Sequence, residues 1–401
     1  MAADVETSII LGGGYAGLAA WEAARRRSRG KWPILLVDRH PVHVLRTELY
    51  EVGRIAARQG AVSPWALPLR SVLGSAEDAL VTGEIEAIDL ESRTVRVAGG
   101  SIRFRELAIC LGSVPSYYGV AGAREHTFNV YRLTEAQRLA EAIRLLESTS
   151  VARGAAPKIV VVGGGSTGTE VAAEIATSDW SRIVGHRCLP PQVTLIAGAL
   201  PFLAGLPGGL VRHARALLLK ARVNLDEGRN STRVDPDGLE LQGGTVVPFD
   251  LCVWAAGNEA PPLVRDLPVP HGRGGRVRVD EHLEIPGFPG VFAVGDVAEY
   301  TDATTHAVVP ATAQAALAEA PVAGENLVAR RLGRPLREFR YREKGVIVAL
   351  GIRAGAGSVR GLTIWGRPAA LVKSASEELH RAEVGRPRAT RRRSLTHARL
   401  K

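Results

Sequence analysis

The stretch that decides the fold is Ser8-Ile9-Ile10-Leu11-Gly12-Gly13-Gly14-Tyr15-Ala16-Gly17, close to the N-terminus. Its apolar start predicts a buried strand over residues 7–12, and the alanine- and arginine-rich residues 18–27 predict a helix directly after the glycines. Glycines between a strand and a helix permit a tight turn and let the backbone approach a pyrophosphate. The free N–H groups of the helix N-terminus then meet the pyrophosphate charge. The stretch therefore predicts a dinucleotide-binding turn.

Asp38 strengthens this prediction and indicates the ligand. A second strand is predicted over residues 33–37, and Asp38 ends it, 21 residues after Gly17. A carboxylate in that place can accept hydrogen bonds from both hydroxyls of an adenosine ribose. Strand, glycine turn, helix and acid in this order favour an FAD site. The residues expected to hold FAD here are Gly12, Gly14, Tyr15, Ala16, Gly17, Asp38 and Arg39.

The same pattern returns in the middle of the chain. A strand at 158–162 precedes the second glycine turn, a helix is predicted over 169–176, and another strand over 193–196. This internal repeat predicts a second dinucleotide, a nicotinamide cofactor. Ala197 stands where the first unit has its acid, and no arginine follows closely, so NADH and NADPH both stay open. The residues expected to bind it are Gly163, Gly165, Ser166, Thr167 and Gly168.

A third motif, Val291-Phe292-Ala293-Val294-Gly295-Asp296, ends a strand late in the chain. An aspartate there can bond a ribityl hydroxyl of a flavin, and a helix N-terminus downstream supports negative charge on reduced flavin. We expect that helix to start at Pro310, to be kinked or ended by Pro321, and to be followed by a helical stretch to about Leu332. Further residues expected to contact the cofactors are Gly112, Gly257, Gly295, Asp296 and Ala313.

The remaining strands complete the predicted fold. They are expected at 80–88, 94–97, 107–111, 251–255, 345–350 and 358–364. Strands alternating with helices predict an α/β fold with two Rossmann-like dinucleotide-binding domains, the NAD(P) domain inserted in the FAD domain, and a small C-terminal domain. We expect the FAD domain at 1–120 and 271–335, the NAD(P) domain at 121–270, the C-terminal domain at 336–380 and a disordered basic tail at 381–401.

Composition and charge limit the classes of function. The 401 residues are 46% hydrophobic and 23% charged, which is ordinary globular composition. No apolar run is long enough to cross a bilayer, and the acidic N-terminus does not resemble a secretion signal. Much of the net charge of +10 lies at the C-terminus, where residues 381–401 hold eight basic side chains and Glu383 as the one acid. We expect a solvated tail or a contact with anionic lipid rather than a nucleic-acid site, because no recognition motif accompanies the charge.

The three cysteines, Cys110, Cys188 and Cys252, are far apart in the sequence. They therefore form neither a Cys-x-x-Cys redox pair nor a zinc-ligand set, and we expect no metal. Cys110 and Cys252 lie within apolar strands, which predicts buried, inert thiols. This cysteine usage fits the reducing cytoplasm, with the inner face of the cell membrane as the place of any peripheral contact.

Taken together, the motifs resemble the type II NADH dehydrogenase (NADH:quinone oxidoreductase) family of the pyridine nucleotide-disulfide reductase-like superfamily. The resemblance runs from about Ser8 to Tyr341. It rests on Leu49-Tyr50-Glu51-Val52, Pro68-Leu69-Arg70, Leu111-Gly112-Ser113, Tyr118-Gly119-Val120-Ala121-Gly122, Thr167-Gly168-Thr169-Glu170-Val171, Trp254-Ala255-Ala256-Gly257, Gly295-Asp296, Ala313-Gln314 and Lys344-Gly345.

The resemblance implies one FAD, NADH or NADPH as substrate, and a quinone as acceptor. A hydride passes from the nicotinamide to the flavin, and the reduced flavin then reduces the quinone. The implied catalytic residues are Glu170 near nicotinamide and flavin, Gln314 on the quinone-contacting helix, and Lys344 near flavin and quinone. Two features depart from the family: Ala318 replaces a second glutamine, and the C-terminal segment is poor in large apolar residues.

Two other functions stay open. The chain could pass electrons to a soluble acceptor such as a ferredoxin or rubredoxin, which Ala318 and the weak C-terminal anchor favour, and the basic tail could attract an acidic carrier. It could instead be a non-catalytic sensor that binds FAD and NAD(P)H, because Ala197 weakens the case for tight nicotinamide binding. A homodimer is compatible with each of these functions.

Overall fold

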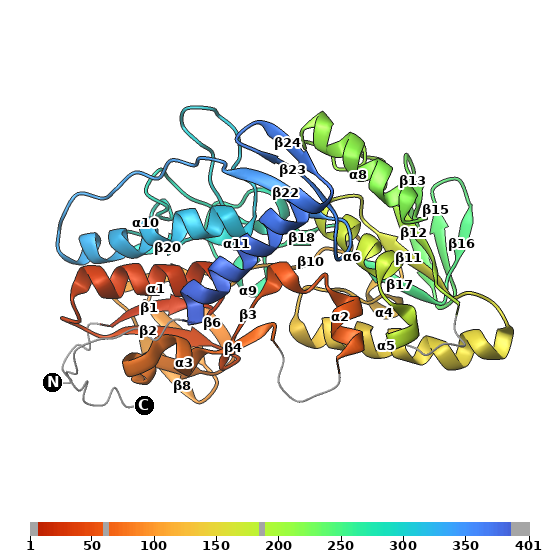
Figure 1. The fold of residues 1–401 in the computed structure, drawn as a ribbon. Coiled ribbons are helices and arrows are strands. Elements are labelled where there is room, and N and C mark those ends of the chain that lie inside the picture. Colours follow the sequence, from red (N-terminus) through yellow and green to blue (C-terminus); the bar gives the residue numbers. More distant parts are fainter. Residues whose placement is uncertain (1–6, 59–63, 184–188, 386–401) are drawn as a thin grey trace.

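The computed structural model describes residues 7–58, 64–183 and 189–385. Two parallel sheets organise it (Figure 1), with the strand orders β20-β9-β1-β2-β5 and β13-β12-β11-β17. The first sheet consists of β1 (Ser8–Leu11), β2 (Ile34–Asp38), β5 (Leu80–Thr82), β9 (Glu106–Ile109) and β20 (Val291–Ala293). The second consists of β11 (Lys158–Val162), β12 (Gln192–Ile196), β13 (Asn224–Asp226) and β17 (Leu251–Trp254).

The first sheet is built from two distant parts of the chain. β20 pairs in parallel with β9, although the whole second sheet lies between them in the sequence. The short strands β10 (Val114–Pro115) and β18 (Asn258–Glu259) pair where the chain enters and leaves the second sheet. One dinucleotide-binding unit is thus inserted in the other, which confirms the predicted α/β fold class.

Smaller sheets and the helices complete the fold. The three-stranded antiparallel sheets are β6 (Ile85–Asp89), β7 (Thr94–Val97) and β8 (Gly100–Arg103); β14 (Ser231–Asp235), β15 (Gly238–Leu241) and β16 (Val246–Pro248); and, near the C-terminus, β22 (Gly345–Ala349), β23 (Gly355–Val359) and β24 (Leu362–Trp365). The two-stranded sheets are β3 (Val42–Val44) with β4 (Ala66–Pro68) and β19 (Val277–Arg278) with β21 (Ala298–Glu299). The α-helices are α1 (Tyr15–Ser28), α2 (Val52–Ala57), α3 (Leu69–Leu73), α4 (Ala123–His126), α5 (Leu133–Arg153), α6 (Ser166–Thr177), α7 (Trp180–Ile183), α8 (Gly208–Lys220), α9 (Pro262–Arg265), α10 (Ala313–Arg331) and α11 (Arg367–Gly385).

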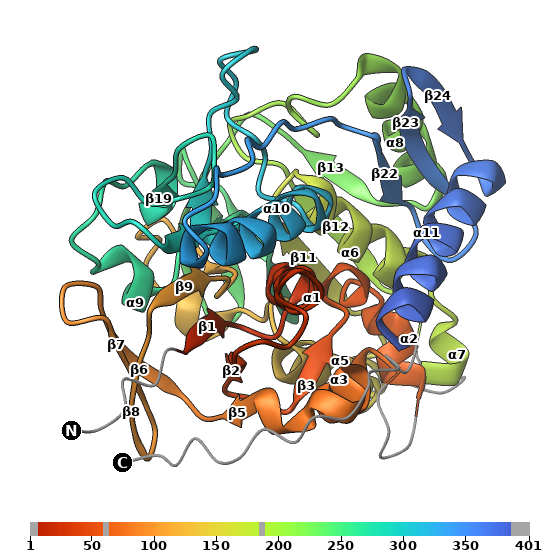
Figure 2. The same ribbon diagram turned by 90° about the vertical axis from the view of Figure 1, so that its left-hand side faces the viewer.

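Helices α1 and α10 lie side by side against the first sheet (Figures 1 and 2). Trp21 and Leu327 from the two helices are buried in one apolar cluster with Phe292 of β20. Small residues let the helices approach closely, because a Cβ on Gly324 would lie 2.2 Å from the Ala20 carbonyl oxygen. This contact fixes where the first turns of both helices lie.

The helix after Gly295-Asp296 starts later than predicted. α10 begins at Ala313 rather than at Pro310, because Thr312 is extended and its hydroxyl oxygen accepts the Ala315 N–H at 3.2 Å, an N-cap. Pro321 does not end the helix, which continues to Arg331. Proline removes one backbone hydrogen bond, and the close packing against α1 outweighs that loss.

Two of the predicted strands are each two strands. Residues 80–88 divide into β5 and β6, because the Gly83 N–H donates to the Asp38 carbonyl at 2.9 Å and the chain then leaves the parallel sheet to pair with β7. Residues 358–364 form a hairpin between β23 and β24. Arg360 and Gly361 both have positive φ, 51° and 83°, which is the conformation of a two-residue hairpin turn.

The C-terminal sheet and α11 connect the two parallel-sheet units. β22, β23 and β24 pack on α6 and α8, and the Trp365 ring stacks on His213 of α8 with the ring centres 3.9 Å apart. α11, dark blue in Figure 1, runs from this sheet toward α1, and the His380 ring stacks on Tyr15 with the ring centres 4.4 Å apart. The predicted basic tail begins inside α11, which extends to Gly385, and residues 386–401 lie outside the described residues.

We expect Gly324→Ala to lower the free energy of unfolding by about 1–3 kcal/mol, because its Cβ would force α10 away from the Ala20 backbone. Gly208→Ala in α8 is the matched control: the nearest atom to its Cβ is Arg212 Nη1 at 3.9 Å, so alanine there is expected to leave stability unchanged or improve it. Thermal unfolding measures both. Equal midpoints for the two variants would contradict the close packing of α1 and α10.

Candidate functional site

The first glycine turn has the geometry that pyrophosphate binding requires. Gly12 has a φ of +100°, and a Cβ there would lie 2.4 Å from the Cys110 carbonyl oxygen. A Cβ on Gly17 would lie 1.7 Å from the Gly12 carbonyl oxygen, so α1 starts pressed against the end of β1. Gly14 borders open space, and no side chain caps α1. The N–H groups of the first helical turn can therefore meet an anion.

The second glycine turn repeats this geometry. Gly163 has a φ of +126°, and its Cβ would lie 2.3 Å from the Ala255 carbonyl oxygen. A Cβ on Gly168 would lie 1.9 Å from the Gly163 carbonyl oxygen, and Gly165 borders open space. Ser166 and Thr167 open helix α6, which has no side-chain cap. The chain thus contains two anion-binding helix starts of the same construction.

The two turns differ in the residue that follows the second strand of each unit. Asp38 Oδ2 accepts the Gly13 N–H at 2.6 Å, which holds this carboxylate beside the first turn. In the second unit Ala197 takes the equivalent place, because a Cβ on Gly164 would lie 2.6 Å from Ala197 Cβ. The first turn therefore offers an acceptor for ribose hydroxyls, and the second does not. Arg39, also predicted to contact FAD, directs its guanidinium to Glu84 at 3.1 Å.

The Gly295-Asp296 motif is held by a hydrogen-bonded chain from both units. Ser113 donates its hydroxyl hydrogen to Asp296 Oδ2 at 2.7 Å, and Asn258 Nδ2 donates to Ser113 Oγ at 3.0 Å. Gly112 and Gly257 precede these two residues and have positive φ, 68° and 153°. The two chain segments that contain these predicted glycines therefore meet beside Asp296 through Ser113 and Asn258.

Glu319 of α10 also binds the Gly295-Asp296 motif. Its Oε2 accepts the Gly295 N–H at 2.7 Å from helix α10, which starts at the predicted residue Ala313. Burial raises the pKa of Glu319 to about 7. A carboxyl group that can change its protonation state near neutral pH thus touches the turn assigned to the flavin.

Glu170 forms a buried ion pair with a residue that the sequence analysis did not assign. Glu170 Oε1 accepts from Lys373 Nζ at 2.8 Å and from the Ala349 N–H at 3.0 Å. Burial by itself lowers the pKa of Lys373, but the Glu170 and Glu377 carboxylates raise it overall. The lysine therefore carries its charge inside the protein, between α6 and α11.

More titratable side chains surround this ion pair. The Lys373 ammonium lies 5.1 Å from the ring centre of Tyr50, and Glu377 Oε1 lies 3.6 Å from Lys373 Nζ. Burial raises the pKa values of both Glu377 and Glu174 to about 7. The cluster can hold protons at neutral pH, and the Lys373-x-x-x-Glu377 spacing on one helix was the signal for it in the sequence.

A cavity of about 520 Å³ lies beside the cluster, between α2 and α11. Its lining includes Glu48, Glu51, Arg54, Arg58, Trp65, Glu377, Glu378 and Arg381. Glu48 pairs with Arg381, and Glu51 with Arg54. The wall of this cavity is therefore mainly ionic, with Ala57, Pro64 and Trp65 as its apolar part.

Gln314 and Lys344 meet through backbone atoms. Gln314 Oε1 accepts the Lys344 N–H at 2.7 Å, and Gln314 Nε2 donates to the Gly345 carbonyl at 3.2 Å. The Lys344 residue is exposed. The structure thus brings the two predicted residues together at the entry to β22, where the side-chain amide of Gln314 binds the backbone of Lys344 and Gly345.

The thiols of Cys110 and Cys252 are buried, and burial raises the pKa of each. The prediction that these two thiols are buried is confirmed, and a raised pKa disfavours the thiolate, which is the reactive form. Cys188 lies outside the described residues.

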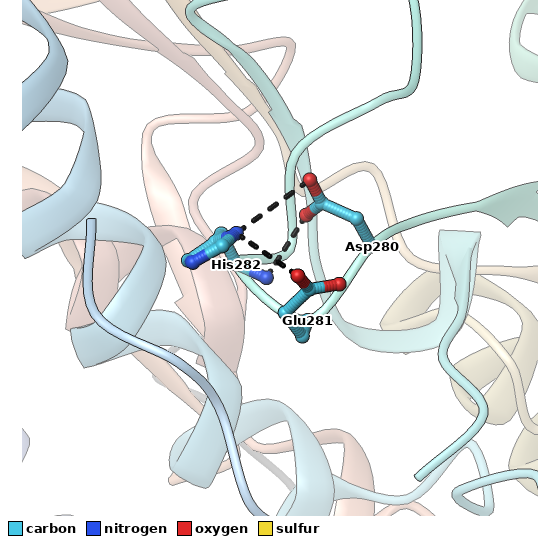
Figure 3. A group of neighbouring side chains, drawn as sticks. All are labelled: Asp280, Glu281 and His282. Atoms are coloured by element: carbon cyan, nitrogen blue, oxygen red, sulfur yellow. Dashed lines mark hydrogen bonds and ion pairs between the residues drawn. The ribbon is translucent and has the colours of Figure 1, made fainter. Parts of the chain in front are cut away.

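Asp280, Glu281 and His282 bring three potential metal-ligand atoms within 4.8 Å of one another (Figure 3). The backbone explains this arrangement without an ion. Asp280 Oδ1 accepts the N–H groups of His282 and Glu284, at 2.9 and 2.8 Å, which shapes a turn. We assign no metal to this turn.

Comparison with known proteins places this geometry in a family. A family model described as pyridine nucleotide-disulphide oxidoreductase matches residues 7–320. The chain belongs to this family. An NADH dehydrogenase-like protein of Mycobacterium tuberculosis is 34% identical and covers 72% of each chain. A demethylphylloquinone reductase of Synechocystis is 29% identical and covers 90% of this chain and 89% of its own.

Solved structures agree with the fold. This oxidoreductase superposes on NDH2 from Plasmodium falciparum, solved in complex with NADH, with a TM-score of 0.79 over 93% of this chain and 94% of the other. The sequence identity is 14%, so the likeness shows the fold alone. The roles of individual site residues stay predictions.

We expect Lys373→Met to lower the free energy of unfolding by about 3–5 kcal/mol, because it leaves the Glu170 carboxylate buried and unpaired. The double variant Glu170→Gln/Lys373→Met removes both charges and is expected to recover most of that loss. Arg182→Met breaks an exposed ion pair with Asp179 and is the control, with an expected loss below about 1 kcal/mol. Thermal unfolding that ranks Lys373→Met with Arg182→Met would contradict the buried pair.

Proposed function

We propose that this chain is an FAD-dependent NADH:quinone oxidoreductase. The observation that carries the proposal is the pair of glycine turns, of which the first alone has a carboxylate, Asp38, beside it. Both turns open helices whose N-termini can meet a pyrophosphate, and the linkers between the two units meet at Asp296. The names of the relatives from Synechocystis and M. tuberculosis support a quinone acceptor and an NADH donor.

The residues present fit an FAD at the first turn and NADH at the second. The Gly12 turn and the start of α1 would hold the FAD pyrophosphate, Asp38 its adenosine ribose, and Asp296 its ribityl chain. The Gly163 turn and the start of α6 would hold the pyrophosphate of NADH. FAD, when bound, supplies two-electron chemistry between a reduced nicotinamide and a quinone.

Glu170 and Lys373 supply the protein's part in proton movement in this proposal. A quinone takes up protons when it is reduced. The charged Lys373 ammonium can donate one, and its Nζ lies 2.8 Å from Glu170 Oε1. Glu377 lies next in the same cluster, beside the ionic cavity. Protons can therefore be held on largely buried side chains close to the junction of the two units.

A soluble acceptor such as a ferredoxin is the second candidate. Ala318 removes the side-chain amide expected on α10, and the cavity beside Lys373 is lined by carboxylates and guanidinium groups. Both features favour a polar acceptor over a long apolar one. The two glycine turns are compatible with a quinone acceptor and with a ferredoxin acceptor.

Under anaerobic conditions we expect NADH to bleach the absorbance of the bound flavin, and a short-chain quinone to restore it. Glu170→Gln is expected to slow the reoxidation by about a hundredfold, the size of a general acid–base contribution. Glu383→Gln, which changes an exposed carboxylate of α11 outside the lining of the cavity beside Lys373, is the control and is expected to react as the parent does.

Three outcomes would contradict the proposal or redirect it. A purified protein without flavin, or with flavin that NADH leaves oxidised, would contradict it. Faster turnover with a ferredoxin than with the quinone would select the second candidate. Slow turnover with every acceptor would indicate the non-catalytic sensor.

We also propose that α11 contacts a membrane surface. No helix in residues 7–58, 64–183 and 189–385 is long and apolar enough to span a bilayer. Leu371 and Leu379 of α11 are 70% and 65% exposed, and Leu362 and Trp365 of the adjacent β24 are 72% and 51% exposed. The sequence after this helix is strongly basic, so apolar and cationic groups follow one another along the chain.

Leu371→Glu/Leu379→Glu is expected to weaken binding to anionic lipid vesicles at least tenfold, because each leucine contributes roughly 1.5–3 kcal/mol when its side chain leaves water. Leu219→Glu is the control, because Leu219 is 64% exposed on α8. Co-sedimentation with vesicles measures the three proteins. Equal binding of both variants and the parent would contradict the contact through α11.

A further inference from the structure

Arg46 lies where the flavin-binding elements of the first unit meet the second unit. It opens a short 3₁₀ helix, Arg46–Glu48, between β3 and α2, and is partly buried. Its Nη2 donates to the Ser113 carbonyl at 3.4 Å, and its Nη1 lies 2.8 Å from the place a Cβ on Gly112 would take. Its guanidinium carbon lies 6.0 Å from the ring centre of Tyr131, whose hydroxyl donates to the Gly257 carbonyl at 2.7 Å.

No carboxylate among the described residues forms an ion pair with Arg46. The acids around it have other partners. Asp296 accepts from Ser113, Glu48 pairs with Arg381, and Glu51 accepts from Arg54 and Trp65. A partly buried cation without a counter-ion is unfavourable, so this arrangement favours an anion that the chain itself does not provide.

We infer that Arg46 binds an anionic group of FAD. This inference rests on the proposed function, because it takes FAD as the occupant of the first turn. The guanidinium offers up to five N–H donors in a plane, which suits a phosphate or a delocalised oxygen anion. FAD has two such groups: the pyrophosphate, which is always charged, and the isoalloxazine ring, which becomes anionic on reduction.

The position of Arg46 favours FAD over the nicotinamide dinucleotide. Gly112 and Ser113 belong to the strand end beside Gly12 and reach Asp296 of the third motif. The second glycine turn is instead closed by Ala255 and Ala197. Arg46 has no contact with either of these residues in the described part of the chain.

The test uses flavin-free protein titrated with FAD, with quenching of flavin fluorescence as the readout. Arg46→Gln is expected to raise the Kd at least tenfold and to reduce its dependence on salt, and Arg46→Lys is expected to lie between. Arg124→Gln is the matched control, because the Arg124 guanidinium carbon lies 4.9 Å from the ring centre of Tyr117 and the variant removes a comparable cation from a tyrosine ring. The affinity of this control variant for FAD is expected to stay within twofold of the parent. If Arg46→Gln does not fold, Arg46→Lys, which keeps the charge but loses the planar donor set, carries the test.

Two further measurements distinguish the anions. If Arg46 binds the pyrophosphate, Arg46→Gln weakens ADP binding by the same factor as FAD binding and leaves the midpoint potential of the flavin unchanged. If Arg46 binds the reduced isoalloxazine, ADP binding is unchanged in Arg46→Gln. Reduced FAD then binds about tenfold more weakly relative to oxidised FAD, which lowers the two-electron midpoint potential by about 30 mV.

An Arg46→Gln protein that equals the parent in FAD affinity, ADP affinity and flavin potential would overturn the inference. If Arg46→Gln does not fold, a folded Arg46→Lys protein that equals the parent in these three measurements would also overturn the inference. If FAD binding depends on Arg46 but NADH does not reduce the bound flavin, the proposed function is overturned and this inference still stands.

Discussion

The contact on which the structure depends is that of a helix start with the backbone at the end of a strand. At Gly17 and again at Gly168 the helix lies so close to a carbonyl oxygen of the preceding turn that a methyl group has no room. This approach aims the unpaired N–H groups of α1 and α6 at open space beside Gly14 and Gly165. The fold thus produces an anion site twice, by the same backbone contact, in two sheets that share no strand.

The packing of α1 against α10 extends this constraint to the third motif. Because Gly324 lies against Ala20, α10 is held close to the first turn, and Glu319 on α10 reaches the Gly295 N–H. The chain from Asn258 through Ser113 to Asp296 fixes the same motif from the second unit. Strand ends, linkers and a helix that are distant in the sequence therefore converge on one loop.

The C-terminal segment supplies the charged side chains that surround Glu170. Its sheet packs on α6 and α8, and α11 places Lys373 on Glu170 and His380 on Tyr15. Charged groups taken out of water are stable only when they are paired, which explains why Glu170, Lys373 and Glu377 occur together. The price of that ionic arrangement is a set of carboxyl groups with raised pKa values, and such groups are suited to hold protons near neutral pH.

The sequence by itself determined the two glycine turns, the acid at Asp38 and its absence at Ala197, the parallel α/β fold and the insertion of one unit in the other. These features depend on local backbone geometry and on short apolar patterns, which neighbouring residues determine. The start of α10 at Ala313 and the hairpin at Arg360 were missed because a cap and a two-residue turn weigh little in an apolar pattern. Only the tertiary structure decided that Lys373 pairs with Glu170, that Gln314 holds the Lys344 backbone, and that Arg46 lies at Ser113 without an acid. Lys373 and Glu170 are 203 positions apart, so their pairing depends on how whole elements pack, and no local pattern in the chain encodes it.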